Sequence, residues 1–288
     1  KGIGMILTFG LLMNAFYYLV KKYSKKTVES QAFYPSLMTI IIINLIHVLF
    51  LKDELLLYLL PFATIPIILT ILGDKLFALL FTIMNMIILT RDDNWFLVVM
   101  AVVLVAIYKA DKLTNRSEIV KLGIFLGMFQ ATLAFSYGLV NQLELSSIIV
   151  MIVFSVMSGI FTGMTSLALL PYYENTFDIL TDIKLVELSD FSHPLLKQLL
   201  MTAPGTFHHS IMVGALAESG AEAIGANATF ARVSSYYHDI GKTEHPFFFI
   251  ENLPAHMESP HKMIGPYESK EIIFDHVRKG VEILKQHQ

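Results

Sequence analysis

The chain has 288 residues, of which 55% are hydrophobic and 16% are charged, and its mean hydropathy is +0.60. Soluble domains carry about 25% charged residues, so this composition indicates a membrane protein and excludes an ordinary soluble domain. The net charge of −3 argues against binding of a nucleic acid polymer, and the lack of cysteine excludes disulfides and thiolate metal sites.

Seven apolar runs fill the first 171 residues, and each is long enough, or nearly so, for a membrane span of about 20 residues. They are Ile3–Val20, Tyr34–Leu51, Leu55–Leu72, Leu76–Thr90, Trp95–Tyr108, Ile119–Val140 and Ser147–Leu170. The fourth and fifth runs are short and are separated only by Arg91–Asn94. A re-entrant hairpin there is the alternative to seven spans. Because the chain starts at Lys1 without a methionine, we interpret it as an excerpt of a longer protein, not as a signal peptide.

Basic residues gather in two loops, one after the first span and one after the fifth. The positive-inside rule places both loops in the cytoplasm. With seven spans the N-terminus lies outside and everything after Pro171 lies inside, as in a multi-pass membrane protein. The basic residues are Lys21, Lys22, Lys25 and Lys26 in one loop, and Lys109, Lys112, Arg116 and Lys121 in the other.

Small residues recur four apart in the last two spans, a spacing that favours close helix contacts in lipid. We interpret them as packing within one bundle, with a homodimer interface as the alternative. They are Gly123, Gly127, Ser155, Gly159 and Gly163. Mid-span charge is absent, which disfavours a transporter, and the few polar residues favour interhelical hydrogen bonds. These polar residues are Asn14, Asn44, His47, Asn85 and Gln130.

The sequence predicts three parts: a transmembrane bundle over 1–171, a connector over 172–193 and a helical domain over 194–288. We expect the connector to form short helices or strands, with its acidic residues, such as Glu174, on a solvated face. After Pro194 the apolar spacing is helical throughout, as in Leu195, Leu196, Leu199 and Leu200, so this part is predicted to be all-α. Long helices are predicted from about His208 and over Ala228–His238.

Candidate ligands lie in this last part, where His238 and Asp239 are adjacent and His209 precedes them by one helix and a turn. Imidazole and carboxylate suit a borderline to hard divalent metal. Because adjacent side chains point about 100° apart around a helix, a metal that meets both must lie at a helix end. Gly241 is expected to let the chain turn sharply there. Lys242 would then lie beside the metal, where it suits a phosphate oxygen.

These residues resemble the HD phosphohydrolases, which are named for an adjacent His-Asp pair of metal ligands. The matching motifs are His209-Ser210-Ile211-Met212-Val213, His238-Asp239-Ile240-Gly241-Lys242 and Asp275-His276-Val277. More closely, essentially the whole chain resembles the seven-transmembrane HD proteins, the PgpH-type cyclic-di-AMP phosphodiesterases. This resemblance is carried by Ala203-Pro204-Gly205-Thr206-Phe207-His208-His209-Ser210, Tyr236-Tyr237-His238-Asp239-Ile240-Gly241-Lys242 and Phe248-Phe249-Ile250-Glu251-Asn252.

The resemblance implies two divalent metal ions, Mn²⁺ or Fe. One ion would be held by His209, His238 and Asp239, while Asp239 would bridge to the second, which His276 helps to hold. It implies hydrolysis of cyclic-di-AMP to linear pApA, with Asp239 in catalysis. We add Lys242 as a catalytic residue that contacts the phosphate, and His208 as a candidate substrate contact whose alternative is a purely structural role. The family's downstream His-His pair, its closing Asp and its extracytoplasmic domain have no match in these residues, so we expect this part alone to hold an incomplete second metal site.

Other interpretations of residues 194–288 stay open. His245, His256 and His261 are predicted to be solvated surface residues, and the run Phe247–Phe249 is predicted to serve packing more than base stacking. The alternative function is a non-catalytic transmembrane receptor whose helical domain binds a nucleotide or a partner. Ligand spacing alone does not separate adenine from guanine dinucleotides.

Overall fold

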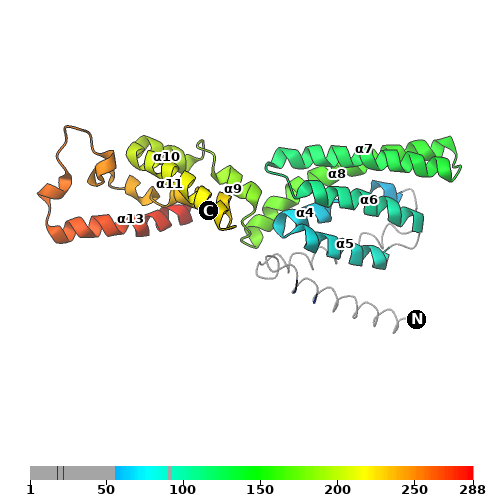
Figure 1. Ribbon diagram of the computed structural model, residues 1–288. Helices are drawn as coiled ribbons and strands as arrows, with labels where there is room; N and C mark the ends of the chain where they lie inside the picture. Colours follow the sequence, from blue (N-terminus) through cyan, green and yellow to red (C-terminus); the bar gives the residue numbers. More distant parts are fainter. Residues whose placement is uncertain (1–17, 19–21, 23–55, 90–92, 288) are drawn as a thin grey trace. The chain divides into compact units, whose positions relative to one another are not determined.

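The computed structural model describes residues 18, 22, 56–89 and 93–287 (Figure 1). Every regular element within these residues is a helix, and none of them forms a strand, which confirms the all-α class. The chain divides into two compact units, an N-terminal unit, Lys1–Thr181, and a C-terminal unit, Asp182–Gln288. Of the predicted spans, Ile3–Val20 and Tyr34–Leu51 lie almost entirely outside the described residues.

The N-terminal unit confirms four of the predicted helices and corrects one. The runs from Leu76 onward correspond to α5, α6, α7 and α8, whereas the run Leu55–Leu72 is broken into a short 3-10 helix and α4. Pro61 explains the break, because proline lacks a backbone donor and disfavours a helical conformation in the residue before it. The elements are η1 (Leu56–Leu59), α4 (Thr64–Leu72), α5 (Lys75–Leu89), α6 (Asp93–Ala110), α7 (Arg116–Val140) and α8 (Leu145–Thr176).

Polar side chains of α7 and α8 satisfy the backbone around this break. Gln130 Nε2 donates to the Tyr58 carbonyl at 3.2 Å, and Ser158 Oγ donates to the Leu60 carbonyl at 2.6 Å. Irregular backbone at membrane depth is tolerated where protein groups replace water in this way. Gln130 therefore has the predicted interhelical role. The other predicted polar positions, Asn14, Asn44, His47 and the Asn85 side chain, lie outside the described residues.

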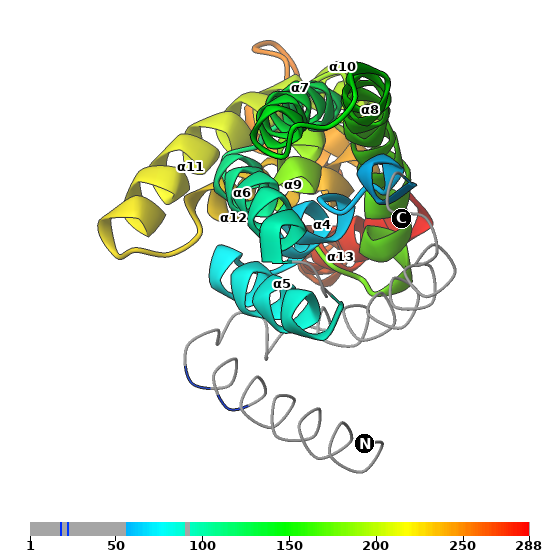
Figure 2. The same ribbon diagram turned by 90° about the vertical axis from the view of Figure 1, so that its right-hand side faces the viewer.

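Two helices in the described part of the chain, α7 and α8, are long and apolar enough to cross a membrane. The two lie side by side (Figures 1 and 2). Their small residues meet face to face, since a Cβ built on Gly159 would lie 2.3 Å from Gly127 Cα. Many of their large apolar side chains, Met128 and Met164 among them, are exposed, whereas others, such as Leu126 and Met151, are buried. Small residues inside and large apolar residues outside are the arrangement expected of helices in lipid, and the contact confirms packing within one bundle.

The end of α8 differs from the prediction. The helix passes through Pro171 and ends at Thr176, and it carries Glu174 in its last turns. Glu174 is only 5% exposed and pairs with Arg116 at the start of α7. The prediction of a solvated acidic face is therefore wrong for Glu174, because a cation from another helix compensates its burial.

The C-terminal unit is built from five α-helices and short 3-10 turns within the described residues. Leu195, Leu196 and Leu199 are buried as predicted and pack with Phe207 and Val233 in one core, whereas Leu200 is exposed. The predicted connector, 172–193, contains the end of α8 and one short helix, Asp182–Leu188, joined by turns. The helices are α9 (Asp182–Leu188), α10 (Pro194–Thr202), α11 (Pro204–Ala223), α12 (Ala228–Tyr237) and α13 (Pro266–Gln286). The α11 helix starts at Pro204, four residues before the predicted His208, because proline is well suited to the first helical position.

Candidate metal centre

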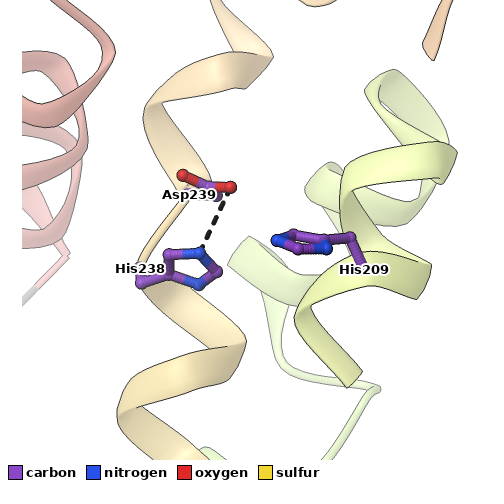
Figure 3. Close-up of side chains that lie close together, drawn as sticks. All are labelled: His209, His238 and Asp239. Atoms are coloured by element: carbon purple, nitrogen blue, oxygen red, sulfur yellow. Dashed lines mark ion pairs between the residues drawn. The ribbon is translucent and has the colours of Figure 1, made fainter. Parts of the chain in front are cut away.

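Two helices bring the first three candidate ligands together. His209 projects from α11, while His238 and Asp239 follow directly after the last residue of α12. One ligand atom from each residue lies within 4.8 Å of the other two, and no other such group occurs among the described residues (Figure 3). The two helices pack closely because Gly214 of α11 lacks a side chain: a Cβ there would lie 2.6 Å from a ring carbon of Tyr236. The predicted convergence at a helix end is thus present.

A backbone carbonyl orients the imidazole of His238. Its Nδ1 lies 2.7 Å from the Ser235 carbonyl, which can only accept, so Nδ1 carries the proton and Nε2 is directed elsewhere. That Nε2 lies 3.2 Å from Oδ2 of Asp239, and this carboxylate raises the pKa of His238. Histidines that bind metals usually donate their second nitrogen to a carbonyl in this manner.

His276 of α13 approaches the opposite oxygen of the same carboxylate. Its Nε2 lies 3.3 Å from Oδ1 of Asp239, and its Nδ1 bonds the Ile273 carbonyl. The two histidines therefore face the two oxygens of Asp239 with equivalent orientation. A carboxylate flanked in this way has the donors required to serve two ions.

Gly241 permits this approach, but for a reason other than the predicted turn. Its φ is not positive, since Gly225 is the one glycine in the described part of the chain with a positive φ. A Cβ on Gly241 would instead lie 1.9 Å from the His276 carbonyl oxygen and 2.5 Å from the Gly280 nitrogen. Gly241 is thus required for the close contact that brings α13, and with it His276, to the centre.

Lys242 closes the centre on one side. Its Nζ lies 2.8 Å from Oδ2 of Asp239 and 2.8 Å from Oε1 of Glu251, and 4.8 Å from the centre of the Phe249 ring. Burial opposes the charge of Lys242, but hydrogen bonds to the two carboxylates outweigh it and raise the pKa of Lys242. Burial likewise opposes ionisation of Asp239, yet hydrogen bonds from His238 and Lys242 hold the pKa of Asp239 well below its ordinary value. Asp239 is therefore ionised and can accept only.

The remaining predicted residues lie outside this cluster. His208 is exposed on α11, and His245 and His256 are exposed as predicted. His261 corrects the prediction, because it is half-buried, with Nε2 2.8 Å from the Phe248 carbonyl and Nδ1 2.7 Å from Ser269 Oγ. It joins the last residue of η3 (Pro246–Phe248) to α13.

Aromatic packing next to the centre agrees with the prediction for the phenylalanine run only in part. Phe249 is buried and packs edge-on against His276, whereas Phe247 is exposed. No role was predicted for Thr206, Glu251 or Asn252, although these residues form a hydrogen-bonded group beside Lys242. The only indication of a role was that they belong to two of the motifs that carry the family resemblance, 203–210 and 248–252.

The donor set fits a divalent metal ion. It offers correctly oriented imidazole nitrogens and an ionised carboxylate, which is the mixture that Mn²⁺ and Fe accept. The cation of Lys242 lies at the rim, where a ligand with negative oxygens would be attracted.

Comparison with protein families identifies both units. A family model described as "7TM receptor with intracellular HD hydrolase" matches residues 1–181, and a model described as "HD domain" matches residues 206–288. The cyclic-di-AMP phosphodiesterase PgpH of Listeria monocytogenes is 32% identical over 273 residues, which cover 91% of this chain and 38% of that protein. The protein of the same name in Bacillus subtilis is 38% identical over 175 residues, covering 60% and 24%. The chain thus spans well under half the length of these relatives.

Solved structures also match about a third of this chain. A crystal structure of the L. monocytogenes phosphodiesterase PgpH HD domain is 52% identical, and the match covers 33% of this chain and 45% of that chain with a TM-score of 0.32. The same domain in complex with cyclic-di-AMP is 49% identical, with coverages of 34% and 46% and a TM-score of 0.33.

Proposed function

We propose that this chain, which belongs to the family of 7TM receptors with an intracellular HD hydrolase, is part of a membrane-tethered, metal-dependent phosphodiesterase that hydrolyses cyclic-di-AMP to linear pApA. The observation that carries the proposal is the convergence of His209, His238 and Asp239 within 4.8 Å. The choice of substrate rests on the names of the two curated relatives.

We infer that the centre takes two divalent ions, Mn²⁺ or Fe. His209, His238 and Asp239 would hold the first, and His276 with the second oxygen of Asp239 would contribute to the other. Such ions, when bound, supply an activated water and stabilise negative charge on phosphorus and on the leaving oxygen. The protein's share is orientation, because the Ser235 and Ile273 carbonyls fix the two imidazoles toward Asp239.

Lys242 supports the proposal as the phosphate contact. An ammonium group has three N–H donors, and the two carboxylates Asp239 and Glu251 take two of them. The third is then available to a phosphodiester oxygen. His208 stays a proposed substrate contact, since it is exposed next to His209 on α11.

Location supports a signalling role. We place the protein in the bacterial cell membrane as a multi-pass protein, with the N-terminus outside and the C-terminal unit in the cytoplasm. The support is the basic segment formed by the last turn of α6 and the loop to α7, where Lys109 and Lys112 are exposed. The seven spans, the boundaries 1–171, 172–193 and 194–288, and a homodimer are part of the same proposal. An external signal would then act on the hydrolase through the membrane bundle.

The test is an assay of the purified full-length protein with cyclic-di-AMP, by chromatography of the products, with and without Mn²⁺. We expect metal-dependent formation of pApA, and loss of both activity and bound metal in His238→Ala. Nucleotide binding without turnover in the presence of metal would favour the receptor alternative. Solute uptake into proteoliposomes would favour a transporter.

A further inference from the structure

We propose that Glu251 is a positioning residue of this centre, which holds Lys242 in place and is itself fixed to the first turn of α11 by Thr206 and Asn252. The proposal rests on the proposed function, because Lys242 is placed there as the phosphate contact. Glu251 belongs to η4 (Ile250–Asn252). The metal-ligand group of His209, His238 and Asp239 includes neither Glu251 nor Thr206 nor Asn252.

The Glu251 carboxylate joins two elements through a single oxygen. Its Oε1 accepts from Lys242 Nζ at 2.8 Å and from Thr206 Oγ1 at 3.0 Å. The lysine side chain has a long flexible stem, so a point charge at its end needs a partner to stay in one place. The ring of Phe249, two residues before Glu251, supports the same ammonium from the side.

Asp239 alone would be a poor anchor for Lys242. In the proposed function both oxygens of Asp239 face the metal ions, so they are shared between the ions and the lysine. Glu251 is the carboxylate that pairs with Lys242 without joining the ligand group. Its negative charge thus keeps the ammonium at the rim, where a phosphate would meet it.

Asn252 fixes this carboxylate to the start of α11. Its Oδ1 accepts from the Thr206 backbone N–H at 2.9 Å, and its Nδ2 donates to Thr206 Oγ1 at 2.9 Å. The first N–H groups of a helix have no partner within the helix, and Ala203, at the N-cap position, offers no side-chain acceptor. Asn252 therefore caps α11 from a distant part of the chain, in the helix that carries His209.

Gly205 shows how tightly the two segments fit. A Cβ on Gly205 would lie 1.8 Å from the Glu251 carbonyl oxygen and 2.9 Å from Oδ1 of Asn252. Only glycine admits this contact without moving the backbone. Two segments thus pack together to position Lys242 and His209: Pro204-Gly205-Thr206 and the pair Glu251-Asn252.

The experiment is a double-mutant cycle on the full-length protein loaded with Mn²⁺. Glu251→Ala is expected to lower kcat by about 10- to 100-fold, the usual effect of removing a supporting partner, with unchanged bound metal. Glu251→Gln should retain more activity, since its amide oxygen still accepts from Lys242. In a Lys242→Ala background, Glu251→Ala should have no further effect, because its role acts through the lysine. Glu258→Ala, at an exposed partner of Lys262, is the matched control.

A second pair separates positioning from folding. Thr206→Val removes the hydroxyl that holds Glu251 and should lower kcat, while Thr206→Ser should restore it. The proposal is overturned if the double mutant loses kcat by the product of the two single losses from Glu251→Ala and Lys242→Ala. It is also overturned if Glu251→Ala loses bound metal. The cycle is repeated with two further readouts. One is the rate of cleavage of bis(p-nitrophenyl) phosphate, and the other is the dissociation constant for cyclic-di-AMP. If the wild type fails to cleave cyclic-di-AMP, the proposed function fails, whereas the coupling in these two readouts still decides the role of Glu251.

Discussion

Arg116 Nη2 lies 2.7 Å from Oε2 of Glu174, so the first residue of α7 is joined to the last turns of α8. The Glu174 side chain is 3% exposed and that of Arg116 is 21% exposed. The Thr181 hydroxyl donates to the other oxygen of Glu174. The carboxylate also lies near the N-terminus of α7, where the helix dipole favours negative charge. Thr181, the last residue of the N-terminal unit, and the end of α8 are therefore fixed to the start of α7 through Glu174.

Glu174→Ala is expected to lower the free energy of unfolding by about 3 kcal/mol, because it leaves Arg116 partly buried without its anion. Chemical denaturation in detergent, followed by circular dichroism, measures this change. Glu144→Ala is the control, since Glu144 is exposed at the other end of α8 and should change stability by less than about 0.5 kcal/mol. Equal effects of the two substitutions would contradict the role of the ion pair.

Gly159→Ala tests the contact between α7 and α8. The added Cβ would lie 2.3 Å from Gly127 Cα and 2.5 Å from the Gly123 carbonyl oxygen, so the backbones must separate. We expect a loss of about 1–3 kcal/mol, as for other overpacked interiors. Gly220→Ala is the control, because nothing lies within 4 Å of its Cβ and alanine favours a helix by up to about 1 kcal/mol. The idea fails if both substitutions stabilise the protein.

Local patterns predicted helices α5 to α8 and the candidate ligands that the structure brings together. Apolar runs predicted α5 to α8 because helices in lipid need long uncharged segments, and spacing of small residues predicted the face through which α7 meets α8. The His238-Asp239 pair alone was weak evidence for a metal centre, and the prediction depended on three spaced motifs. His209 and His276 were then found by their motifs, and the structure places both at this centre.

Contacts between distant segments could not be predicted. The break at Pro61 was not predicted, and Gln130, which donates to the Tyr58 carbonyl beside it, belongs to another helix. Glu174 was expected in solvent because its neighbours in the sequence are polar, whereas Arg116 decides its burial. The role of Asn252 as a cap for α11 depends on the three-dimensional path of the loop after Gly241. Residue periodicity carries no information on that path.

His193 is expected to make the C-terminal unit less stable at acidic pH. Burial lowers the pKa of His193, and the nearby Lys184 and His287 act in the same direction. The folded state thus favours the neutral ring. Its stabilising contribution is fully present above the unfolded pKa, near 6.5, and is lost as pH falls through the lower folded value.

Thermal unfolding of the wild type at pH 5 to 7.5 should show this acid dependence, and His193→Asn should reduce it. Asparagine cannot titrate, and it is a favoured residue at the N-cap position that His193 occupies before α10. His256→Asn, at an exposed histidine, should leave the acid dependence unchanged. A wild type whose unfolding midpoint is flat across this pH range would rule out the role of His193.

Removal of single ligands should separate the two proposed metal positions. In His238→Ala we expect activity to fall by more than about 100-fold. We also expect that Mn²⁺ no longer raises the unfolding midpoint, because an ion that binds only the folded protein stabilises it and this ion is lost. In His276→Ala we expect retention of one ion, since His209, His238 and Asp239 stay together. Elemental analysis of the full-length protein measures the stoichiometry, and His245→Ala is the exposed control. Loss of all metal from His276→Ala would mean that His276 serves the first ion, and that the two oxygens of Asp239 are not divided between two sites.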